Sequence, residues 1–359
     1  MKISIVMRFH DDTASGGRKI IYEYANYLVE KGHNVDITFL ADTPYKQRKF
    51  NFVKHAGHLV DFFRRKSSQN NVTWFPLNKA IKLNANYSLK KNVFRDRDVV
   101  IAFDYGIALH ISGKIKNLNK VVYFIQSDEK VYVEDGIVDA AWKLPMQKIV
   151  VSSWLYDMLK KHDNKVMLVK NYVKTENFYI EKPVEDRGRI VSLLNHPSIS
   201  KDVLTGIKAL KIVHDRFPDL KVIFFGNPNR PSDLPEYFEY IQKADEKVLR
   251  SNIYNQSSIF LFTSKSEGWG LVATEAMASG AALVSTRNGG VDDFGIDGET
   301  ALLSDVGDFK DLANNIIRLL ENDDMRIKLA KNGADLVNTL TFENSANEFE
   351  KVLESVANQ

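Results

Sequence analysis

The sequence predicts an α/β protein with two doubly wound domains, each built around a parallel sheet. Three observations indicate this class. Strand-like and helix-like segments alternate along most of the chain, the alternation is interrupted at residues 172–188, and 359 residues correspond to about two domains of ordinary size. The hydrophobic share of 44% is typical of a globular protein and excludes a disordered chain.

The first 40 residues contain a strand–helix–strand unit. Lys2–Phe9 is an apolar run rich in Ile, Val and Met, which is typical of a buried strand. Apolar residues then recur at helical spacing until Gly32, which ends the helix, and Asn34–Leu40 is a second strand. Such a unit implies a parallel sheet covered by helices. The further strands expected in this half are Val99–Phe103, Val121–Ile125, Ile149–Val151 and Val166–Val169.

Residues 45–97 differ from their surroundings, because they are basic, polar and poorly periodic. We expect loops there, with one short amphipathic helix near the middle of the stretch.

A linker is predicted at residues 172–188, which hold a proline, charges of both signs and no clear period. It separates a domain of residues 1–171 from a domain of residues 172–342. The second domain is expected to contain strands at Ile190–Leu194, Lys221–Phe225, Ser258–Thr263 and Ala281–Ser285, and helices at Lys201–Phe217, Leu271–Ser279, 308–321 and 324–338, followed by a last helix at 343–357. Two such domains in tandem are expected to enclose a cleft. The carboxyl ends of both sheets can face it, and ligands bind at those ends.

Composition excludes several classes of protein. The chain has no cysteine, which excludes disulfides, iron–sulfur clusters, thiolate zinc sites and cysteine nucleophiles. It holds no run of about 20 apolar residues, and its first residues turn polar too soon for a signal peptide. We therefore expect a cytoplasmic protein.

Charge is distributed unevenly along the chain. Residues 1–175 carry 29 Lys and Arg against 17 Asp and Glu, a net charge of +12, whereas the remainder carries 20 against 29, a net charge of −9. A basic half favours anionic partners such as phosphorylated ligands, acidic lipid headgroups or nucleic acid. A solvated surface without a partner is the alternative interpretation.

The segment from Thr263 to Gly280 carries the strongest functional signal. It follows the apolar strand Ile259–Phe262, passes through a turn in which two glycines flank Trp269, and enters a helix. Such a turn presents backbone N–H groups at a helix N-terminus, where the helix dipole also favours a phosphate or pyrophosphate. The glycines allow the backbone to approach the ligand closely.

Two carboxylates, Glu267 in the turn and Glu275 in the helix, can line one ligand from different ends. A carboxylate is a natural acceptor for neighbouring hydroxyl groups. A glycine turn for phosphate and two carboxylates for hydroxyls together describe a site for a sugar nucleotide. The spacing of the two acids alone is a weak signal, and the surrounding strand, glycines and helix make it strong.

This segment resembles the signature of the retaining glycosyltransferases of family 4, which have the GT-B fold of two Rossmann-like domains. Glu267 and Glu275 stand at the two acidic positions of that signature. Gly16-Gly17 before the first helix, the Gly-Gly loop at 288–293 and the strand expected beyond it at 297–303 are also similar to the family. The resemblance is close over about 190–320, moderate over 1–40 and 98–170, and poor over 45–97.

The resemblance implies a retaining transfer of a sugar from a nucleotide donor, without a metal or another cofactor. It assigns Glu267 to sugar hydroxyls near the reacting carbon and Glu275 to the ribose. It also implies that the first domain binds the acceptor, that the second binds the donor, and that a C-terminal helix at 343–359 packs back on the first. UDP is the nucleotide expected from family frequency, with dTDP and GDP as alternatives. The expected donor-binding residues are Gly16, Gly17, Asn195, Lys201, Ser264, Glu267, Gly268, Trp269, Gly270, Leu271, Val272 and Glu275.

The sequence departs from the family pattern at two places, where a charged or titratable side chain of the family is missing. An arginine that usually grips the diphosphate is replaced by Asn195 or His196, although Lys201 fits the lysine that follows it. A His or His-Asp that usually follows the strand Val121–Ile125 is replaced by Gln-Ser-Asp-Glu at 126–129. Asp128 is the predicted second catalytic residue beside Glu267, and Glu129 is the alternative for an acid–base or acceptor-positioning role. Ordinary surface carboxylates are the competing interpretation.

The basic stretch 45–97 interleaves cations with aromatic residues, and Arg64, Arg65 and Lys66 follow two phenylalanines near its middle. Nucleic acid could bind such a surface, but the acidic second half and the sugar-nucleotide signature argue against it. We expect an acceptor-side face that meets an anionic membrane or a lipid-linked saccharide. A solvated insertion is the alternative.

Together these observations predict a retaining, metal-independent glycosyltransferase in bacterial surface-glycan assembly. Its acceptor is expected to be a saccharide, free or linked to lipid or protein, and its place the cytoplasm or the inner face of the cell membrane. The alternatives are a catalytically silent binding or chaperone subunit, a GT-B sugar-nucleotide epimerase, and a nucleic-acid-binding protein.

Overall fold

The chain forms two compact units. Unit 1 comprises Met1–Val151, Leu155–Val169 and Ser345–Gln359, and unit 2 comprises Ser152–Trp154 and Lys170–Asn344. The computed structural model describes residues 1–9, 12–41, 60, 62–64, 66, 71–90, 93–131, 133, 135–232 and 234–359.

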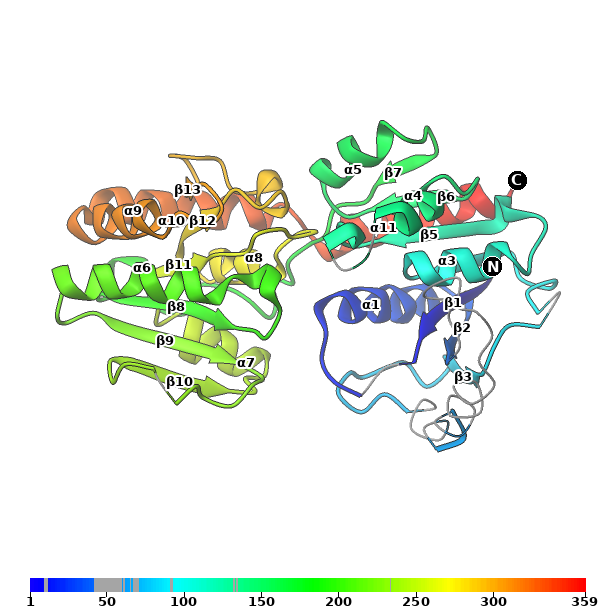
Figure 1. The fold of residues 1–359 in the computed structure, drawn as a ribbon, viewed down its shortest axis with the longest axis horizontal. Coiled ribbons are helices and arrows are strands. Elements are labelled where there is room, and N and C mark those ends of the chain that lie inside the picture. The colour runs from blue at the N-terminus through cyan, green and yellow to red at the C-terminus, as the bar shows by residue number, and fades with distance from the viewer. Residues whose placement is uncertain are drawn as a thin grey trace. The chain divides into compact units, whose positions relative to one another are not determined.

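The centre of unit 1 is a parallel sheet, which the described residues form with seven strands (Figure 1). The strands follow the order β3-β2-β1-β4-β5-β6-β7. Their bounds are Lys2–Arg8 (β1), Asn34–Leu40 (β2), Lys82–Asn86 (β3), Val99–Ala102 (β4), Val121–Ile125 (β5), Gln147–Val150 (β6) and Val166–Leu168 (β7). The order reverses beside β1, as in a doubly wound sheet, so β1 and β4 define its switch point.

Aromatic rings hold the last helix of the chain in unit 1. Helix α1 (Gly16–Glu30) places Tyr24 against Phe349 of α11 (Phe342–Ala357), with ring centres 4.3 Å apart, and Phe124 of β5 lies 5.5 Å from Phe349. The Tyr24 hydroxyl also shares a 2.7 Å hydrogen bond with the Ser345 hydroxyl. The N-terminal strand and most of the C-terminal helix therefore belong to one unit (Figure 1). The other helices of this half are α3 (Tyr105–Ser112), α4 (Asp135–Trp142) and α5 (Ser153–Lys160).

Unit 2 contains a second parallel sheet, to which the described residues contribute six strands in the order β10-β9-β8-β11-β12-β13. The strands are Ile190–Asn195 (β8), Lys221–Gly226 (β9), Phe238–Gln242 (β10), Ile259–Phe262 (β11), Ala282–Thr286 (β12) and Ala301–Ser304 (β13). The helices are Val203–Arg216 (α6), Glu246–Val248 (α7), Leu271–Ala278 (α8), Phe309–Glu321 (α9) and Asp323–Asn338 (α10). The predicted class, an α/β protein with two doubly wound parallel sheets, is therefore confirmed.

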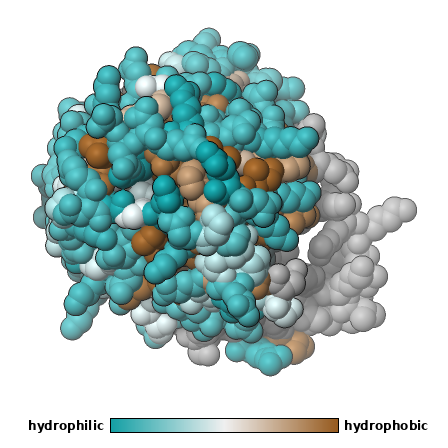
Figure 2. Space-filling view, turned by 90° about the vertical axis from the view of Figure 1, so that its left-hand side faces the viewer, coloured by the Kyte–Doolittle hydropathy of each residue, from teal (hydrophilic) through white to brown (hydrophobic). Residues whose placement is uncertain are grey.

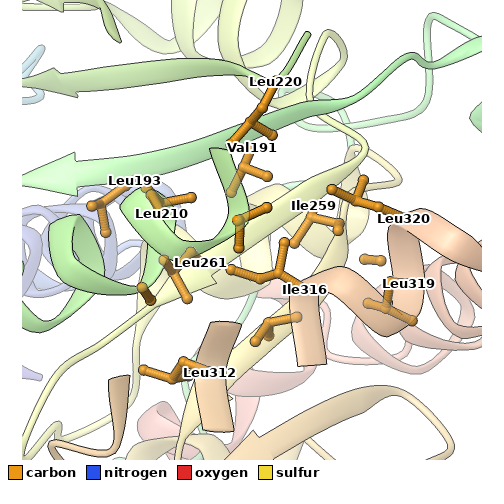
Figure 3. Close-up of a cluster of buried hydrophobic side chains, with 14 of the residues drawn as sticks. Val191, Leu193, Leu210, Leu220, Ile259, Leu261, Leu312, Ile316, Leu319 and Leu320 are labelled. Atoms are coloured by element: carbon orange, nitrogen blue, oxygen red, sulfur yellow. The ribbon is translucent and has the colours of Figure 1, made fainter. Parts of the chain in front are cut away.

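The core of unit 2 lies between its sheet and the helices α6, α9 and α10 (Figure 3). Alternate residues of each strand supply it, as with Val191 and Leu193 on β8 and Ile259 and Leu261 on β11, because successive side chains of a strand point to opposite faces. Helix α9 contributes residues at helical spacing. Each fully buried Val, Leu or Ile side chain stabilises the fold by about 1.5–3 kcal/mol.

The surface differs from this interior. Hydrophilic side chains predominate on the face drawn in Figure 2, and the hydrophobic ones lie in small, separate groups. None of the described helices combines the length and the apolar character needed to cross a bilayer.

Two strands depart from the prediction, and both lie at a sheet edge. β3 reads Lys-Leu-Asn-Ala-Asn and β10 reads Phe-Glu-Tyr-Ile-Gln, neither of which is the apolar run of a central strand, because an edge strand is only partly covered. The expectation of loops and one helix throughout 45–97 is therefore wrong at 82–86. Residues 62–64 and 66 are helical, and residues 45–59 lie outside the described part of the chain.

The stretch 172–188, predicted as a linker, packs into unit 2. Tyr172, Phe178 and Val184 are at most 4% exposed. Arg187 is 4% exposed, and its guanidinium donates hydrogen bonds to the carbonyl oxygens of Lys182, Tyr254, Ser257 and Ser279 and to the Asn255 side-chain oxygen. Burial lowers the pKa of Arg187 to about 10, so the group stays charged at neutral pH. Through these hydrogen bonds, Arg187 connects this stretch to the segments at residues 254–257 and 279.

Replacing Arg187 by Met is expected to lower the free energy of unfolding of unit 2 by about 3 kcal/mol, because buried oxygen atoms lose their donor. Urea denaturation measures the loss. Arg189→Met is the matched control, since Arg189 is exposed and forms a 2.9 Å surface ion pair with Asp219. Such pairs contribute about 0–1 kcal/mol, so equal losses in the two variants would contradict the role of Arg187.

Candidate functional site

The predicted donor site lies at the carboxyl edge of the unit 2 sheet, where β8 and β11 run side by side. Residues 196–201 follow β8, whose last residue is Asn195, and the turn 263–270 follows β11. The Thr263 hydroxyl donates to the Lys201 carbonyl at 3.0 Å, and the Lys265 N–H donates to the Ser200 carbonyl at 2.7 Å. These bonds join the two segments, as expected for the ends of adjacent parallel strands.

Glu267 is the meeting point of three predicted site residues. One of its carboxylate oxygens accepts a hydrogen bond from the Lys201 ammonium at 2.5 Å and another from the Ser264 hydroxyl at 2.5 Å. The Glu267 side chain is 10% exposed and that of Lys201 is 23% exposed. The carboxylate is therefore held by a cation and a hydroxyl, while the Lys201 side chain stays partly exposed.

Glycines give the turn its shape. Gly270 has a φ of +113° at the start of α8, and a Cβ there would lie 2.9 Å from the Phe262 ring. Gly290 packs beneath the turn, since a Cβ at that position would lie 2.3 Å from the Trp269 carbonyl oxygen and 2.7 Å from the Glu267 Cβ. Both positions thus require glycine for steric reasons.

The end of β12 and the loop that follows it are hydrogen-bonded to the turn. The Glu267 N–H donates to the Asn288 carbonyl at 3.0 Å, and the Thr286 hydroxyl donates to the Ser264 carbonyl at 2.5 Å. The Asn288 side-chain oxygen accepts the Val291 N–H at 3.1 Å, which fixes the loop itself. The resemblance indicates this Gly-Gly loop, but not that it supports the backbone of the turn.

The Trp269 side chain belongs to the packing of unit 2. It is 2% exposed and lies 5.5 Å, centre to centre, from the Phe294 ring. A contact of Trp269 with a ligand therefore has to involve its backbone. Gly268, Leu271 and Val272 surround the start of α8, where the first N–H groups have no acceptor inside the helix. These groups can receive a phosphate, and their role in donor binding stays a prediction.

Glu275 lies inside α8 and is 8% exposed. The Tyr254 hydroxyl donates to its carboxylate at 3.4 Å. Tyr254 ends a single π-helical turn, Leu249–Tyr254, a feature that often marks functional sites. Burial and then the Glu275 charge raise the pKa of Tyr254 well above its usual value, so this phenol keeps its proton. The sequence contains no signal for this partner, because the two residues are 21 positions apart and meet only in the fold.

Asn195, which with His196 is one of the two candidates for the position of the family arginine, contacts β9 and β10. Its amide donates to the Tyr240 hydroxyl of β10 at 3.0 Å, and Gly226 of β9 packs against its carbonyl. His196 has a lowered pKa, through burial and then the Lys201 charge. Of the two predicted donor-site residues Asn195 and Lys201, it is Lys201 whose side chain contacts Glu267.

Unit 1 carries the remaining predicted residues. Gly16 and Gly17 open α1, and the Gln126 amide donates to the Gly17 carbonyl at 2.9 Å. Asp128 accepts the Lys130 N–H at 3.0 Å in a local turn after β5. Its predicted catalytic role stays a prediction.

The residue after Asp128 has a different environment. Glu129 is 8% exposed, and it accepts hydrogen bonds from the Tyr105 N–H at 2.9 Å and from the Tyr123 hydroxyl. Burial and the neighbouring Asp104 raise the pKa of Glu129 to about 8. Sequence analysis names Glu129 as the alternative to Asp128 but gives no sign of its burial.

The predicted membrane or acceptor face is described only in part. Arg64 and Lys66 are exposed, and Arg65 lies outside the described residues. Phe63 is 70% exposed beside them, whereas Phe62 is buried and stacks on Phe9 at 5.7 Å. In the part of the chain that the structure describes, no group of three His, Asp or Glu residues is arranged to hold a metal ion.

Comparison with known proteins gives a consistent picture. The family model described as glycosyl transferases group 1 matches residues 176–336. The chain is similar to the D-inositol 3-phosphate glycosyltransferase of Corynebacterium glutamicum (29% identity over 168 residues, 43% of this chain and 40% of that protein). It is also similar to the capsular polysaccharide biosynthesis glycosyltransferase CapM of Staphylococcus aureus (26% over 153 residues, 41% and 38%). These matches span about two fifths of the length of either relative.

A solved structure, that of Anabaena Alr3699/HepE in complex with UDP, shares the fold of the whole chain. The TM-score is 0.75 at 13% sequence identity, and the similarity covers 99% of this chain and 100% of the other. A likeness at this identity shows the fold alone.

Gly290→Ala is expected to lower the free energy of unfolding by about 1–3 kcal/mol, because the added methyl group overlaps the backbone of the turn at Trp269. Urea denaturation checks this. Gly188→Ala is the matched control, since a Cβ there meets nothing within 4 Å and its effect should stay within about 1 kcal/mol. A Gly290→Ala protein as stable as the control would show that the loop does not support the turn.

Proposed function

We propose that this chain, whose residues 176–336 match the family model of the group 1 glycosyl transferases, is a retaining glycosyltransferase that moves a sugar from a nucleotide donor to a saccharide-containing acceptor. That match confirms the resemblance of the segment that contains Glu267 to the family 4 enzymes, and the structural comparison confirms the GT-B fold. The observation that carries the proposal is the group of Lys201, Ser264 and Glu267 on the glycine turn before α8.

The turn supports the choice of donor. A diphosphate at the start of α8 would meet backbone N–H groups and the positive end of the helix dipole, and Lys201 would supply a full positive charge. UDP is the proposed nucleotide, because HepE was solved with UDP and has the same fold, with dTDP and GDP as alternatives. Glu275, with Tyr254 beside it, is the proposed acceptor for the ribose hydroxyls.

The proposed chemistry uses the same groups. The bond from the anomeric carbon to the diphosphate oxygen breaks, the acceptor oxygen bonds to that carbon on the same face, and the acceptor proton passes to the departing phosphate. Negative charge grows on the diphosphate, where Lys201 and the helix N-terminus stabilise it, so we propose that no metal is needed. Positive charge grows on the sugar, where the Glu267 carboxylate stabilises it.

The acceptor and the pathway are proposed from a named relative and from the distribution of charge. CapM is named for capsular polysaccharide biosynthesis, and a similar place in bacterial surface-glycan assembly fits this chain. Unit 1 is the proposed acceptor side because it holds most of the basic residues.

Glu267→Gln is expected to lower the rate of sugar transfer about 100-fold or more, because the amide keeps the acceptor for Lys201 and Ser264 but loses the negative charge. The measurement is product formation from UDP-, dTDP- and GDP-sugars with chelator present, where UDP-sugars should react best and chelator should change nothing. Glu299→Gln, an exposed change in the same unit, is the control and should react like the wild type.

Other outcomes identify the alternatives. Isomerisation of the donor without acceptor would indicate an epimerase. Donor binding without turnover by the wild type would indicate a silent binding subunit. A Glu267→Gln enzyme as fast as the wild type would remove Glu267 from the mechanism.

We also propose that the segment around Phe63 attaches the protein to the inner, anionic face of the membrane. Val60 and Phe63 are 69% and 70% exposed, and Arg64 and Lys66 are exposed beside them, so apolar and cationic groups occur together. Each basic residue near an anionic surface adds about 1 kcal/mol of binding free energy.

The double variant Arg64→Glu/Lys66→Glu is expected to bind vesicles that contain phosphatidylglycerol at least about 30-fold more weakly than the wild type, because two lost cations correspond to about 2 kcal/mol of binding free energy. Sedimentation measures the binding. Lys247→Glu/Lys310→Glu, the same reversal at exposed positions of unit 2, should have no such effect. Equal binding by the wild type and the Arg64/Lys66 variant would refute attachment through this segment.

A further inference from the structure

Three polar residues meet at the carboxyl edge of the unit 1 sheet. Arg8 is the last residue of β1, Asp104 follows β4 and Glu129 follows β5. β4 lies between β1 and β5 in the sheet, so the ends of these strands are neighbours. This edge of a doubly wound sheet is where ligands bind.

Arg8 and Asp104 form the outer part of the group. The Arg8 guanidinium donates to the Asp104 carboxylate at 2.7 Å, and the two side chains are 19% and 20% exposed. Asp104 also accepts the Ile107 N–H at 3.0 Å and thereby caps α3. Gly106 leaves room for the guanidinium, because a Cβ there would lie 2.3 Å from it. The pair is therefore fixed on the first turn of α3.

Glu129 forms the buried part of the group. Its two oxygens accept from the Tyr105 N–H, which belongs to the same first turn of α3, and from the Tyr123 hydroxyl of β5. Burial acts first and the Asp104 charge second to raise the pKa of Glu129 to about 8, against the opposing effects of Tyr123, Tyr105 and Arg8. Nearby, Lys130 of the short 3-10 helix η2 (Glu129–Val131) and Asp139 of α4 form an ion pair at 2.7 Å.

We propose that Glu129 is a positioning residue of the acceptor side, whose buried carboxyl group fixes the first turn of α3 and through it the Arg8–Asp104 pair. The proposal rests on the proposed function, because the acceptor is the ligand assigned to unit 1. The pair offers a donor and an acceptor to neighbouring hydroxyl groups of a sugar. Loss of the proton would place a second anion beside Asp104, and the two carboxylates would compete for the Arg8 guanidinium.

Activity tests the proposal through its pH dependence. In the wild type, kcat/KM for the acceptor should fall as the pH rises through about 8, whereas KM for the donor should not change. Glu129→Gln, which stays neutral, should keep most of the activity at pH 7 and lose the alkaline fall. Glu129→Ala should raise the acceptor KM at least tenfold. Glu30→Gln, an exposed change on α1, is the control and should keep the wild-type profile.

Two results of that experiment would overturn the proposal. One is an alkaline fall that persists unchanged in Glu129→Gln. The other is a Glu129→Gln enzyme as impaired at pH 7 as Glu129→Ala.

Two further measurements do not need turnover. Infrared spectra at pH 7 should show the carbonyl band of a protonated carboxyl group that Glu129→Gln lacks.

The pH dependence of stability is the second measurement. The folded state holds the Glu129 proton up to about pH 8, whereas the unfolded chain releases it near the ordinary pKa of 4.5, so the free energy of unfolding should fall as the pH rises between these values. Glu129→Gln should lack this contribution. If the band is absent, or if stability depends on pH equally in the wild type and in Glu129→Gln, Glu129 is not a neutral carboxyl group. If the band is present but no sugar is transferred, only the proposed function is refuted.

Discussion

The ion pair between Lys201 and Glu267 is the contact on which the candidate donor site depends. It joins the segment after β8 to the segment after β11, and backbone bonds to Ser200 and Asn288 hold both in place. Because the two strands are hydrogen-bonded in parallel, their carboxyl ends lie together, and charged residues just beyond them can interact, as Lys201 and Glu267 do. A ligand phosphate that approaches Lys201 meets a cation already oriented by a carboxylate, so little side-chain entropy remains to be lost on binding.

Unit 1 follows the same rule with different chemistry. Arg8, Asp104 and Glu129 stand just beyond three adjacent strands and make a compact polar group, as Lys201, Ser264 and Glu267 do in unit 2. In both units a glycine allows the close approach, Gly106 beneath the guanidinium and Gly290 beneath the turn. Parallel sheets bring such residues together whatever their separation in the sequence.

Much of this arrangement could be predicted from the sequence. Apolar runs indicate the central strands, and helical spacing indicates α9 and α10, because these elements are buried on at least one face. The edge strands β3 and β10 escape this reasoning, since partial cover leaves them polar. The 172–188 stretch is misleading for a similar reason: its charges suggest solvent, but Arg187 is buried and satisfied by carbonyl oxygens that no sequence pattern reveals.

Glu267 and Glu129 show where prediction from sequence ends. Both are glutamates a few residues beyond an apolar strand, and nothing in the sequence indicates that their surroundings differ in charge. In the fold, Glu267 is paired with the Lys201 ammonium, whereas Glu129 is buried with the Asp104 carboxylate as its main charged neighbour. The surroundings of Glu129 favour a neutral acid. Two carboxyl groups can therefore have different roles in one protein. The side chains at the ends of the neighbouring strands determine the role of each.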